Sequence, residues 1–245
     1  MSGSQYSYNS GWKSSVTVNL LIINVLLFVA TWVFNRKGID LNQYLGLHYW
    51  RGSDFNIAQV ITYMFMHANF YHIFFNMFSL WVFGRTLERV MGGKRFLFYY
   101  ISCGIGAAIT QEIVWQFIWA DSIKLFNQEG FVVMQGAEAL EYTMQNGMLD
   151  DYFNAMITIG ASGAVFGVLL AFAMIFPNVP LFLWFIPIPI KAKWMVLGYG
   201  IIELFFGING ISSSVAHFAH LGGMIFGLLI LLYWKHKKII GGRRF

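Results

Sequence analysis

Long apolar stretches separated by short polar segments dominate the pattern along this chain. A helix needs about 20 mostly apolar residues to cross the core of a bilayer, and six stretches are near that length. The short alternating segments typical of membrane β-barrels are absent. The pattern therefore predicts six membrane-spanning helices, at about 16–34, 60–83, 96–111, 160–176, 194–211 and 214–234.

The segments between these spans differ in character. Residues 1–15 read as a polar tail, 235–245 as a basic tail, and 16–234 as one membrane domain. The long insertion 112–158 carries seven acidic residues but one lysine up to Asp151. It also contains tryptophans, so we expect parts of it to be interfacial helix.

Composition and charge agree with a membrane protein. The chain is 58% hydrophobic and 11% charged, and its single cysteine cannot form an internal disulfide. Basic residues stand at the ends of the apolar runs rather than in a stripe, which argues against a nucleic-acid partner. With both termini cytoplasmic, twelve basic residues lie inside and four outside, as the positive-inside rule requires. The acidic insertion then lies outside.

Two polar side chains stand deep in the predicted spans, where such groups are costly and usually functional. Ser162 and His220 each lie fourteen residues from the cytoplasmic end of their span, roughly 21 Å at the rise of an α-helix. A base that takes the proton of a serine hydroxyl makes that serine a nucleophile. We therefore expect Ser162 to be a nucleophile and His220 its base.

The spacing of small residues favours contact between these two spans. Gly163 and Gly167 are four apart in the fourth span, and Gly223 and Gly227 are four apart in the sixth. Such faces let the backbones of membrane helices come close together.

Donors for an oxyanion are predicted at the same level. Ser162 opens its helix, and the first N–H groups of a helix have no internal partner. His72 lies roughly 18 Å above the inner end of the second span, and Asn76 follows it by one turn on the same face. These groups can stabilise the negative charge that develops during acyl transfer.

Taken in order along the chain, these residues resemble the rhomboid intramembrane serine proteases. Any single piece is a weak signal, but the ordered set covers most of the chain and is specific. The matching pieces are Trp50-Arg51, His67, His72 with Asn76, Gly84-Arg85 with Glu88, Gly160-Ala161-Ser162-Gly163, and Ala219-His220-Leu221-Gly222-Gly223 with Gly227.

The resemblance implies an all-α integral membrane protein, a six-transmembrane-helix rhomboid-like bundle with a long extracytoplasmic loop between helices 3 and 4. It implies Ser162 as nucleophile and His220 as base. It implies an oxyanion site made by His72, Asn76 and the backbone N–H of Ser162. His220 is selected over His217 by the glycines that follow it. The supporting residues implied are Phe166, stacked on His220 where many members have Tyr, together with Gly160, Gly163, Gly223, Gly227, Trp50 and Arg51.

The function implied is an endopeptidase that cleaves transmembrane proteins through an acyl-enzyme, without cofactor or metal. Its partners would be transmembrane substrates and the lipid bilayer. The resemblance suggests a bacterial inner membrane, with the active site opening to the extracytoplasmic side. It also implies that the fifth span and the loop after it gate the lateral entry of substrate. Oligomeric state and the role of the insertion stay open.

Four other interpretations compete with this one. Ser162 alone would be read as a packing residue in a small-residue face. His67, His72, His217 and His220 together could bind a metal. Glu203, in the fifth span, is expected to be hydrogen-bonded between helices or water-facing rather than catalytic. A catalytically silent relative that binds or escorts transmembrane clients is the alternative function.

Overall fold

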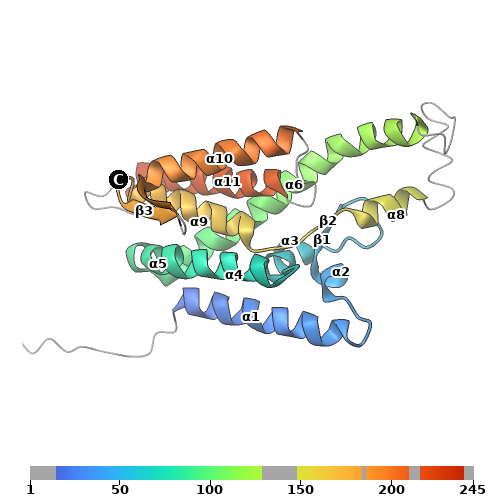
Figure 1. Cartoon of the computed structure of the whole chain (residues 1–245), viewed down its shortest axis with the longest axis horizontal. Coiled ribbons are helices and arrows are strands. Elements are labelled where there is room, and N and C mark those ends of the chain that lie inside the picture. Colours follow the sequence, from blue (N-terminus) through green and yellow to red (C-terminus); the bar gives the residue numbers. More distant parts are fainter. Residues whose placement is uncertain (1–14, 129–147, 184–185, 210–215, 240–245) are drawn as a thin grey trace, which may run out of the picture.

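The computed structural model of the chain describes residues 15–128, 148–183, 186–209 and 216–239. Most of them lie in helices that run side by side, with α1 at one edge of the bundle and α10 at the other (Figure 1). Helix α11 packs mainly against α6 and α9. The principal helices are α1 (Val16–Asn35), α4 (Phe70–Ser79), α5 (Arg85–Met91), α6 (Gly93–Gln128), α9 (Ser162–Ile175), α10 (Ala192–Asn209) and α11 (His217–His236).

Short elements connect these helices. Two pairs of strands form small antiparallel sheets, β1 with β2 and β3 with β4. The short helices are α2 (Leu41–Leu45), α3 (Gln59–Thr62), η1 (Tyr63–Phe65), η2 (Leu80–Gly84) and α8 (Met148–Ala155), and the strands are β1 (Leu47–His48), β2 (Ile157–Thr158), β3 (Pro180–Leu183) and β4 (Ile186–Lys191).

Helix α1 buries mainly polar side chains and exposes most of its apolar ones, which is the reverse of a helix in a soluble protein. Its buried side chains are Thr17, Leu20, Asn24 and Thr31. The amide of Asn24 donates to the carbonyl oxygen of Leu20, 2.7 Å away, so its donor is satisfied within the helix. The apolar side chains point outward, and that of Leu26 is 62% exposed. An apolar exterior of this kind is solvated by lipid tails rather than by water.

Other helices support the same conclusion. Three described helices are long and apolar enough to cross a membrane, Val16–Asn35, Gly93–Phe117 and His217–His236, and Ser162–Ile175 is shorter and apolar. Helix α10 exposes large apolar side chains along its outer face, among them Ile201, Phe205 and Ile208. Exposed apolar surface of this extent marks a membrane or interaction surface. The chain is a mostly helical integral membrane protein.

The second predicted span, 60–83, does not form one helix, so that prediction is wrong. After α3 and η1 the backbone leaves the helical path, and α4 begins only at Phe70. Asn69 is extended, and its side-chain oxygen accepts a hydrogen bond from the backbone N–H of His72. This is the N-cap geometry that starts a helix. The helical path then runs on through η2 and α5 and stops at Gly92, whose φ is +80°.

The third predicted span, 96–111, is too short. Helix α6 continues from Gly93 to Gln128 and projects beyond the rest of the bundle (Figure 1). Polar side chains are compatible with a helix, whereas proline breaks one and glycine weakens it, and neither occurs between Gly106 and Gly130. The insertion 112–158 therefore has helix at both ends, with α8 near its close. Residues 129–147 and most of the two predicted tails lie outside the described residues.

The two small sheets were not predicted. Strand β1 pairs with β2, with Leu47 opposite Thr158, which ties the loop after α1 to the segment just before α9. Strands β3 and β4 form the Pro-rich connection between α9 and α10, with Pro180 opposite Lys191. Proline is tolerated there because both strands of a two-stranded sheet are edge strands.

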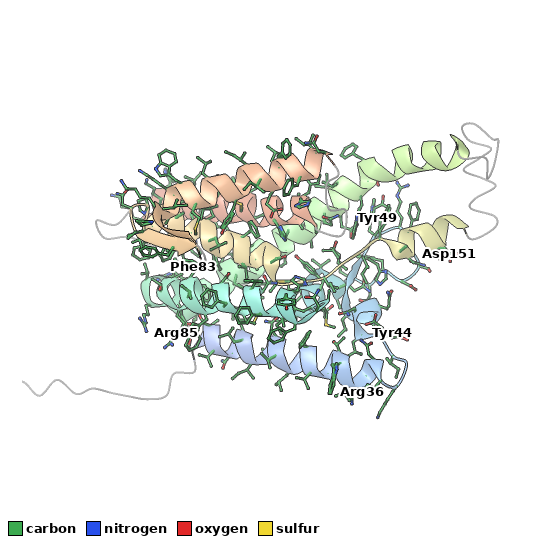
Figure 2. All side chains as sticks on the ribbon, in the orientation of Figure 1. Arg36, Tyr44, Tyr49, Phe83, Arg85 and Asp151 are labelled. Carbon is green, nitrogen blue, oxygen red and sulfur yellow. The ribbon has the colours of Figure 1, made fainter. Side chains whose placement is uncertain are left out.

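Glu88 in α5 fixes the beginning of α1. Its carboxylate accepts hydrogen bonds from the hydroxyls of Ser15 and Thr17, both at 2.7 Å, and from the backbone N–H groups of Val16 and Thr17 at 2.8 and 2.9 Å. The start of α1 and the end of α11 lie at this same end of the bundle (Figure 1). Arg85 lies toward this end and Arg36 toward the other (Figure 2).

Candidate active site

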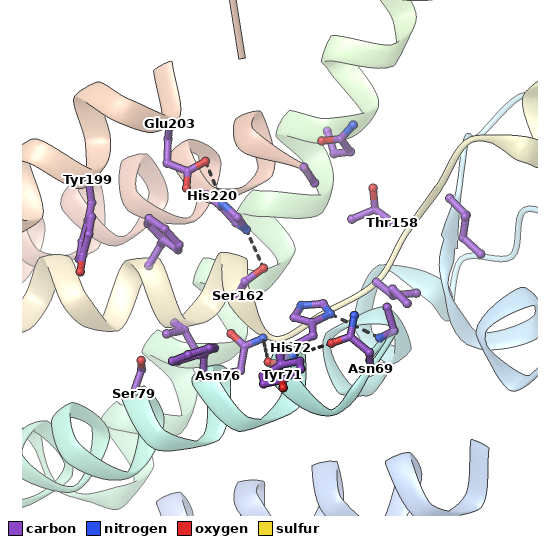
Figure 3. Close-up of a pocket in the computed structure, with 18 of the residues that line it drawn as sticks. Asn69, Tyr71, His72, Asn76, Ser79, Thr158, Ser162, Tyr199, Glu203 and His220 are labelled. Atoms are coloured by element: carbon purple, nitrogen blue, oxygen red, sulfur yellow. Dashed lines mark hydrogen bonds and ion pairs between the residues drawn. The ribbon is translucent and has the colours of Figure 1, made fainter. Parts of the chain in front are cut away.

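Ser162 and His220 meet in the wall of a cavity. The hydroxyl of Ser162, at the first residue of α9, donates to Nε2 of His220 on α11 at 2.7 Å (Figure 3). Fifty-eight residues of sequence separate the two. The contact predicted from matched depth in two spans is therefore present in the structure, with the geometry of a nucleophile and its base.

The turn before Ser162 depends on glycine. Gly160 has φ +131°, a conformation that residues with a side chain rarely adopt. A Cβ at this position would lie 2.7 Å from Nε2 of His72 and 3.5 Å from the hydroxyl oxygen of Ser162. Its N–H donates to the carbonyl oxygen of Tyr63 at 2.9 Å. Gly160 therefore allows His72 to lie directly against the backbone beside the nucleophile.

Close approach of α9 and α11 brings the hydroxyl to the imidazole. Gly223 of α11 lies against the backbone of Gly163 in α9, and Gly167 lies against the carbonyl oxygen of Gly223. Gly227 instead faces α6, where its neighbours are the Tyr99 hydroxyl and Cys103. The predicted small-residue faces thus pack α11 against both of its neighbours.

Phe166 stacks on the base, as expected. Its ring and that of His220 have centroids 4.4 Å apart and planes within 5° of parallel. Phe166 lies one helical turn after Ser162, on the side of α9 that faces the cavity. The stack holds the imidazole ring in the orientation that directs Nε2 at the hydroxyl.

The side chains predicted to stabilise an oxyanion approach the cavity from α4. Nδ1 of His72 accepts a long hydrogen bond, 3.4 Å, from the backbone N–H of Ala68. A neutral ring with Nδ1 as acceptor carries its proton on Nε2, the nitrogen that faces Gly160 and Ser162. Asn76 uses its amide nitrogen to donate to the carbonyl oxygen of His72 at 3.0 Å, and that nitrogen has a second hydrogen.

The helix start at Ser162 supplies the third donor. The first backbone bond of α9 from residue i to i−4 runs from the N–H of Val165 to the carbonyl oxygen of Ala161. The N–H groups that precede it lie in the first turn, where a helix offers free donors and a positive dipole end. Ser162, His72 and Asn76 therefore present donors to one volume.

That volume is a cavity of about 1040 Å³ between α4, α9 and α10. Ser162, His220, His72 and Asn76 all line it, as Figure 3 shows. Its size suits an extended peptide segment rather than a single water molecule.

Glu203 was not predicted to belong to this site. Its Oε2 lies 3.0 Å from Nδ1 of His220 and 2.6 Å from Nδ1 of His217. The expected hydrogen bond between helices is therefore present, but it reaches the histidine that contacts Ser162. The sequence did contain a signal for a role of Glu203 in the site, because an ionisable residue inside an apolar span is usually functional.

The four-histidine metal site does not form among the described residues. His67 packs edge to face on His72, with ring centroids 4.9 Å apart. In the part of the chain that the structure describes, the side chains close enough together to hold a metal ion are Glu203, His217 and His220. The histidines thus fall into two pairs on different sides of the cavity.

Trp50 and Arg51 lie at the outer rim of the molecule. The Trp50 side chain is 53% exposed, and its backbone N–H donates to Glu112 of α6 at 3.0 Å. The guanidinium of Arg51 lies 5.5 Å from the centre of the Trp50 ring. Neither residue lines the cavity that contains Ser162 and His220, and their anchoring role at the membrane interface stays a prediction.

Comparisons with known proteins point to one family. RHOMBOID-like protein 12, mitochondrial, from Arabidopsis thaliana is 29% identical over 223 residues, which is 87% of this chain and 59% of that protein. Rhomboid protein 1, mitochondrial, from Saccharomyces cerevisiae is 25% identical over 241 residues, 98% and 58% respectively. Rhomboid protease AarA from Providencia stuartii is 30% identical over 177 residues, 68% and 52%. The chain spans a little over half the length of these relatives.

A family model described as the Rhomboid domain matches residues 49–237. The match is well over half of the chain, and it contains both the Ser162–His220 contact and the α4 residues that face it. It begins after α1 and ends with the last turn of α11. The chain belongs to the rhomboid family.

Proposed function

We propose that this protein is an intramembrane serine endopeptidase that cleaves other membrane proteins within or near a transmembrane segment. The observation that carries the proposal is the 2.7 Å hydrogen bond from the Ser162 hydroxyl to Nε2 of His220 inside a cavity. A packing serine has no need of a buried imidazole. A nucleophilic serine requires a base within reach of its hydroxyl, and the imidazole of His220 is in that position.

The first step is attack on a peptide carbonyl. Nε2 of His220 accepts the proton of Ser162, and the hydroxyl oxygen forms a bond to the carbonyl carbon of the substrate. The carbonyl oxygen then carries a negative charge. The proposed donors to that oxygen are the N–H of Ser162, Nε2 of His72 and the amide of Asn76.

The second step releases the amine. The tetrahedral intermediate collapses, the C–N bond breaks, and His220 returns its proton to the leaving nitrogen. Ser162 is left as an ester of the amino-terminal half of the substrate, whose new end is the acyl carbon, while the carboxy-terminal half leaves as the amine. Water deprotonated by His220 attacks that ester, the acid departs, and the hydroxyl is restored.

Orientation follows from the basic residues. We infer that both termini are cytoplasmic because twelve basic residues then lie inside and four outside. Arg36 and Arg85 lie toward opposite ends of the bundle (Figure 2), which fits their assignment to opposite sides. The cavity then opens toward the extracytoplasmic side, and we propose the bacterial inner membrane as the compartment.

A serine-reactive fluorophosphonate tests the proposal on the purified protein. Wild type should be labelled, whereas Ser162→Ala and His220→Ala should not, and neither variant should cleave a membrane-anchored reporter in liposomes. His236→Ala, at the exposed end of the same helix, is the matched control and should keep wild-type activity. His217→Ala should retain more activity than His220→Ala.

The same experiment addresses the alternative, a catalytically silent relative that binds transmembrane clients. Folded wild type that resists the label and cleaves no reporter would exclude the protease. Labelling that persists in Ser162→Ala would exclude Ser162 as the nucleophile.

A further inference from the structure

The carboxylate of Glu203 faces the imidazole that contacts the nucleophile. Glu203 lies on α10 and its side chain is 13% exposed, while the side chains of His217 and His220 on α11 are 8% and 10% exposed. Oε2 of Glu203 is 3.0 Å from Nδ1 of His220 (Figure 3). Ser162, His220 and Glu203 therefore form a line of three groups from three helices.

The contact made by one ring nitrogen of His220 determines whether the other ring nitrogen carries the proton. The carboxylate of Glu203 beside Nδ1 favours the neutral tautomer that carries its proton on Nδ1. Nε2 is then the acceptor of the hydroxyl hydrogen of Ser162, 2.7 Å away. Among the described residues, Nδ1 has no aligned hydrogen-bond acceptor although it is buried. Glu203 is at hydrogen-bonding distance but off the N–H direction. Catalytic hydrogen bonds are often poorly aligned in substrate-free enzymes and tighten when substrate binds.

His217 holds the same carboxylate oxygen from the other side. Its Nδ1 lies 2.6 Å from Oε2 of Glu203, a short distance typical of a charge-assisted hydrogen bond. The ring of His217 is packed edge to face on Phe206, with centroids 5.7 Å apart. The hydrogen bond between His217 and Glu203 fixes the carboxylate next to His220. It also compensates part of the free-energy cost of a carboxylate inside an apolar span.

A metal ion is the other occupant that these three groups could serve, since their ligand atoms lie within 4.8 Å of one another. Ligands of tetrahedral zinc lie about 2.0 Å from the metal and so about 3.3 Å apart. The separations of 2.6 and 3.0 Å to Glu203 are shorter than that. They fit hydrogen bonds rather than metal ligands.

We propose that Glu203 is the positioning residue of His220, so that a Ser–His–Glu chain replaces a two-residue site. The carboxylate selects the tautomer with the proton on Nδ1 and stabilises the imidazolium that forms when Nε2 takes the Ser162 proton. It stays unprotonated throughout, as the acid of a serine-protease triad does. This inference rests on the proposed protease function.

Two substitutions of Glu203 separate the effect of its negative charge from the effect of its side-chain shape. Glu203→Gln keeps the size and loses the charge, whereas Glu203→Asp keeps the charge and loses one methylene. We expect Glu203→Gln to lower kcat on a liposome reporter by about 10²-fold with little change in KM, since misorientation of a catalytic histidine acts on the chemical step. Glu203→Asp should keep more activity than Glu203→Gln, and fluorophosphonate labelling rates should follow the same order.

A merely structural role predicts the opposite order, because glutamine fills the space of glutamate better than aspartate does. Activity of Glu203→Gln equal to or above that of Glu203→Asp would overturn the proposal. Asp151→Asn, an exposed carboxylate on α8, is the control and should label at the wild-type rate. If Glu203→Gln fails to fold, Glu203→Asp against Glu203→Asn gives the same comparison.

Two further outcomes distinguish a failure of the protease function from a failure of the role proposed for Glu203. If wild type itself is not labelled, the protease function fails and this inference fails with it. If wild type is labelled and Glu203→Gln matches it, the inference alone is wrong. Activity should be unchanged by 1,10-phenanthroline, and a change that Glu203→Gln abolishes would show that the three side chains hold a metal instead.

Discussion

Replacing Gly223 by alanine should disable the active site although it adds one methyl group. A Cβ at this position would overlap the carbonyl oxygen and carbon of Gly163. Both contacting atoms belong to the backbone of Gly163, in the first turn of α9, so no side-chain rotation can relieve the overlap. The substitution therefore forces α9 and α11 apart.

The size of the effect follows from the contact. Non-bonded heavy atoms pack at about 3.5–4.0 Å, and the carbonyl oxygen of Gly163 would lie far inside that distance. The two backbones must therefore separate locally by roughly 1.5–2 Å. Gly163 follows Ser162 directly, and Gly223 lies one turn after His220. A shift of that size would lengthen the 2.7 Å contact between Ser162 and His220 beyond hydrogen-bonding distance. Misplacement by 1 Å can lower a rate by about 10²-fold, and overpacking costs about 1–3 kcal/mol of stability.

Gly198→Ala is the matched control. Gly198 lies in α10, and a Cβ there would meet no atom within 4 Å. Its replacement should leave activity intact and raise helix stability by roughly 0.5–1 kcal/mol. Reporter cleavage in liposomes and thermal unfolding in detergent measure both effects. Equal activity of the Gly223 and Gly198 variants would refute the argument that backbone contact between α9 and α11 sets the catalytic distance.

Three more predictions concern other contacts. Asn76→Ala should lower kcat by about 10²-fold or more with folding intact, because it removes one oxyanion donor, and a loss confined to KM would contradict this. Phe166→Ala should lower kcat about 3- to 10-fold through loss of the ring stack, whereas Phe166→Tyr should keep it; the two are compared by fluorophosphonate labelling rate. Glu88→Gln should cost about 1 kcal/mol of stability at neutral pH. Burial raises the pKa of Glu88, but hydrogen bonds from Thr17, Ser15 and Val16 outweigh it, and the pKa lies below its usual value. The stabilisation is therefore lost as the pH falls through that depressed pKa, and thermal unfolding of wild type and Glu88→Gln should converge in acid.

Hydropathy and depth predicted the contact that defines the site. The rise per residue is fixed in a helix, so equal distances from the inner surface placed Ser162 and His220 on one level. The glycine spacing then indicated that their helices touch, and α9 and α11 do so at Gly163 and Gly223. Both arguments use geometry that a single sequence determines.

The role of Glu203 was less accessible because side chains of different length reach across helices. Glu203 lies nine residues into the predicted fifth span, roughly 14 Å from its inner end, against about 21 Å for His220. The depths expected for Glu203 and His220 therefore differed by about 7 Å, which did not place them in contact. Oε2 of Glu203 nevertheless lies 3.0 Å from Nδ1 of His220, and the hydropathy pattern does not specify which side chains of neighbouring helices meet.

The second span was predicted as one helix, but the structure interrupts it beside the candidate active site. Hydropathy reports how apolar a segment is, whereas caps decide where a helix begins, and Asn69 caps α4 near the middle of the apolar segment. Non-helical backbone at membrane depth is tolerated only where protein or a water-filled cavity satisfies it. Here Gly160 donates to Tyr63, and β1 pairs with β2 beside it.

Two helices therefore begin at the same cavity, α4 with His72 and α9 with Ser162 in their first turns. A continuous second helix would have removed one of these two ends. The start of α9 offers free N–H groups and the positive end of a dipole to the cavity, and the start of α4 places the side chain of His72 there. In the proposed protease, the interruption of the second span therefore sets His72 beside Ser162, where its side chain can donate to an oxyanion.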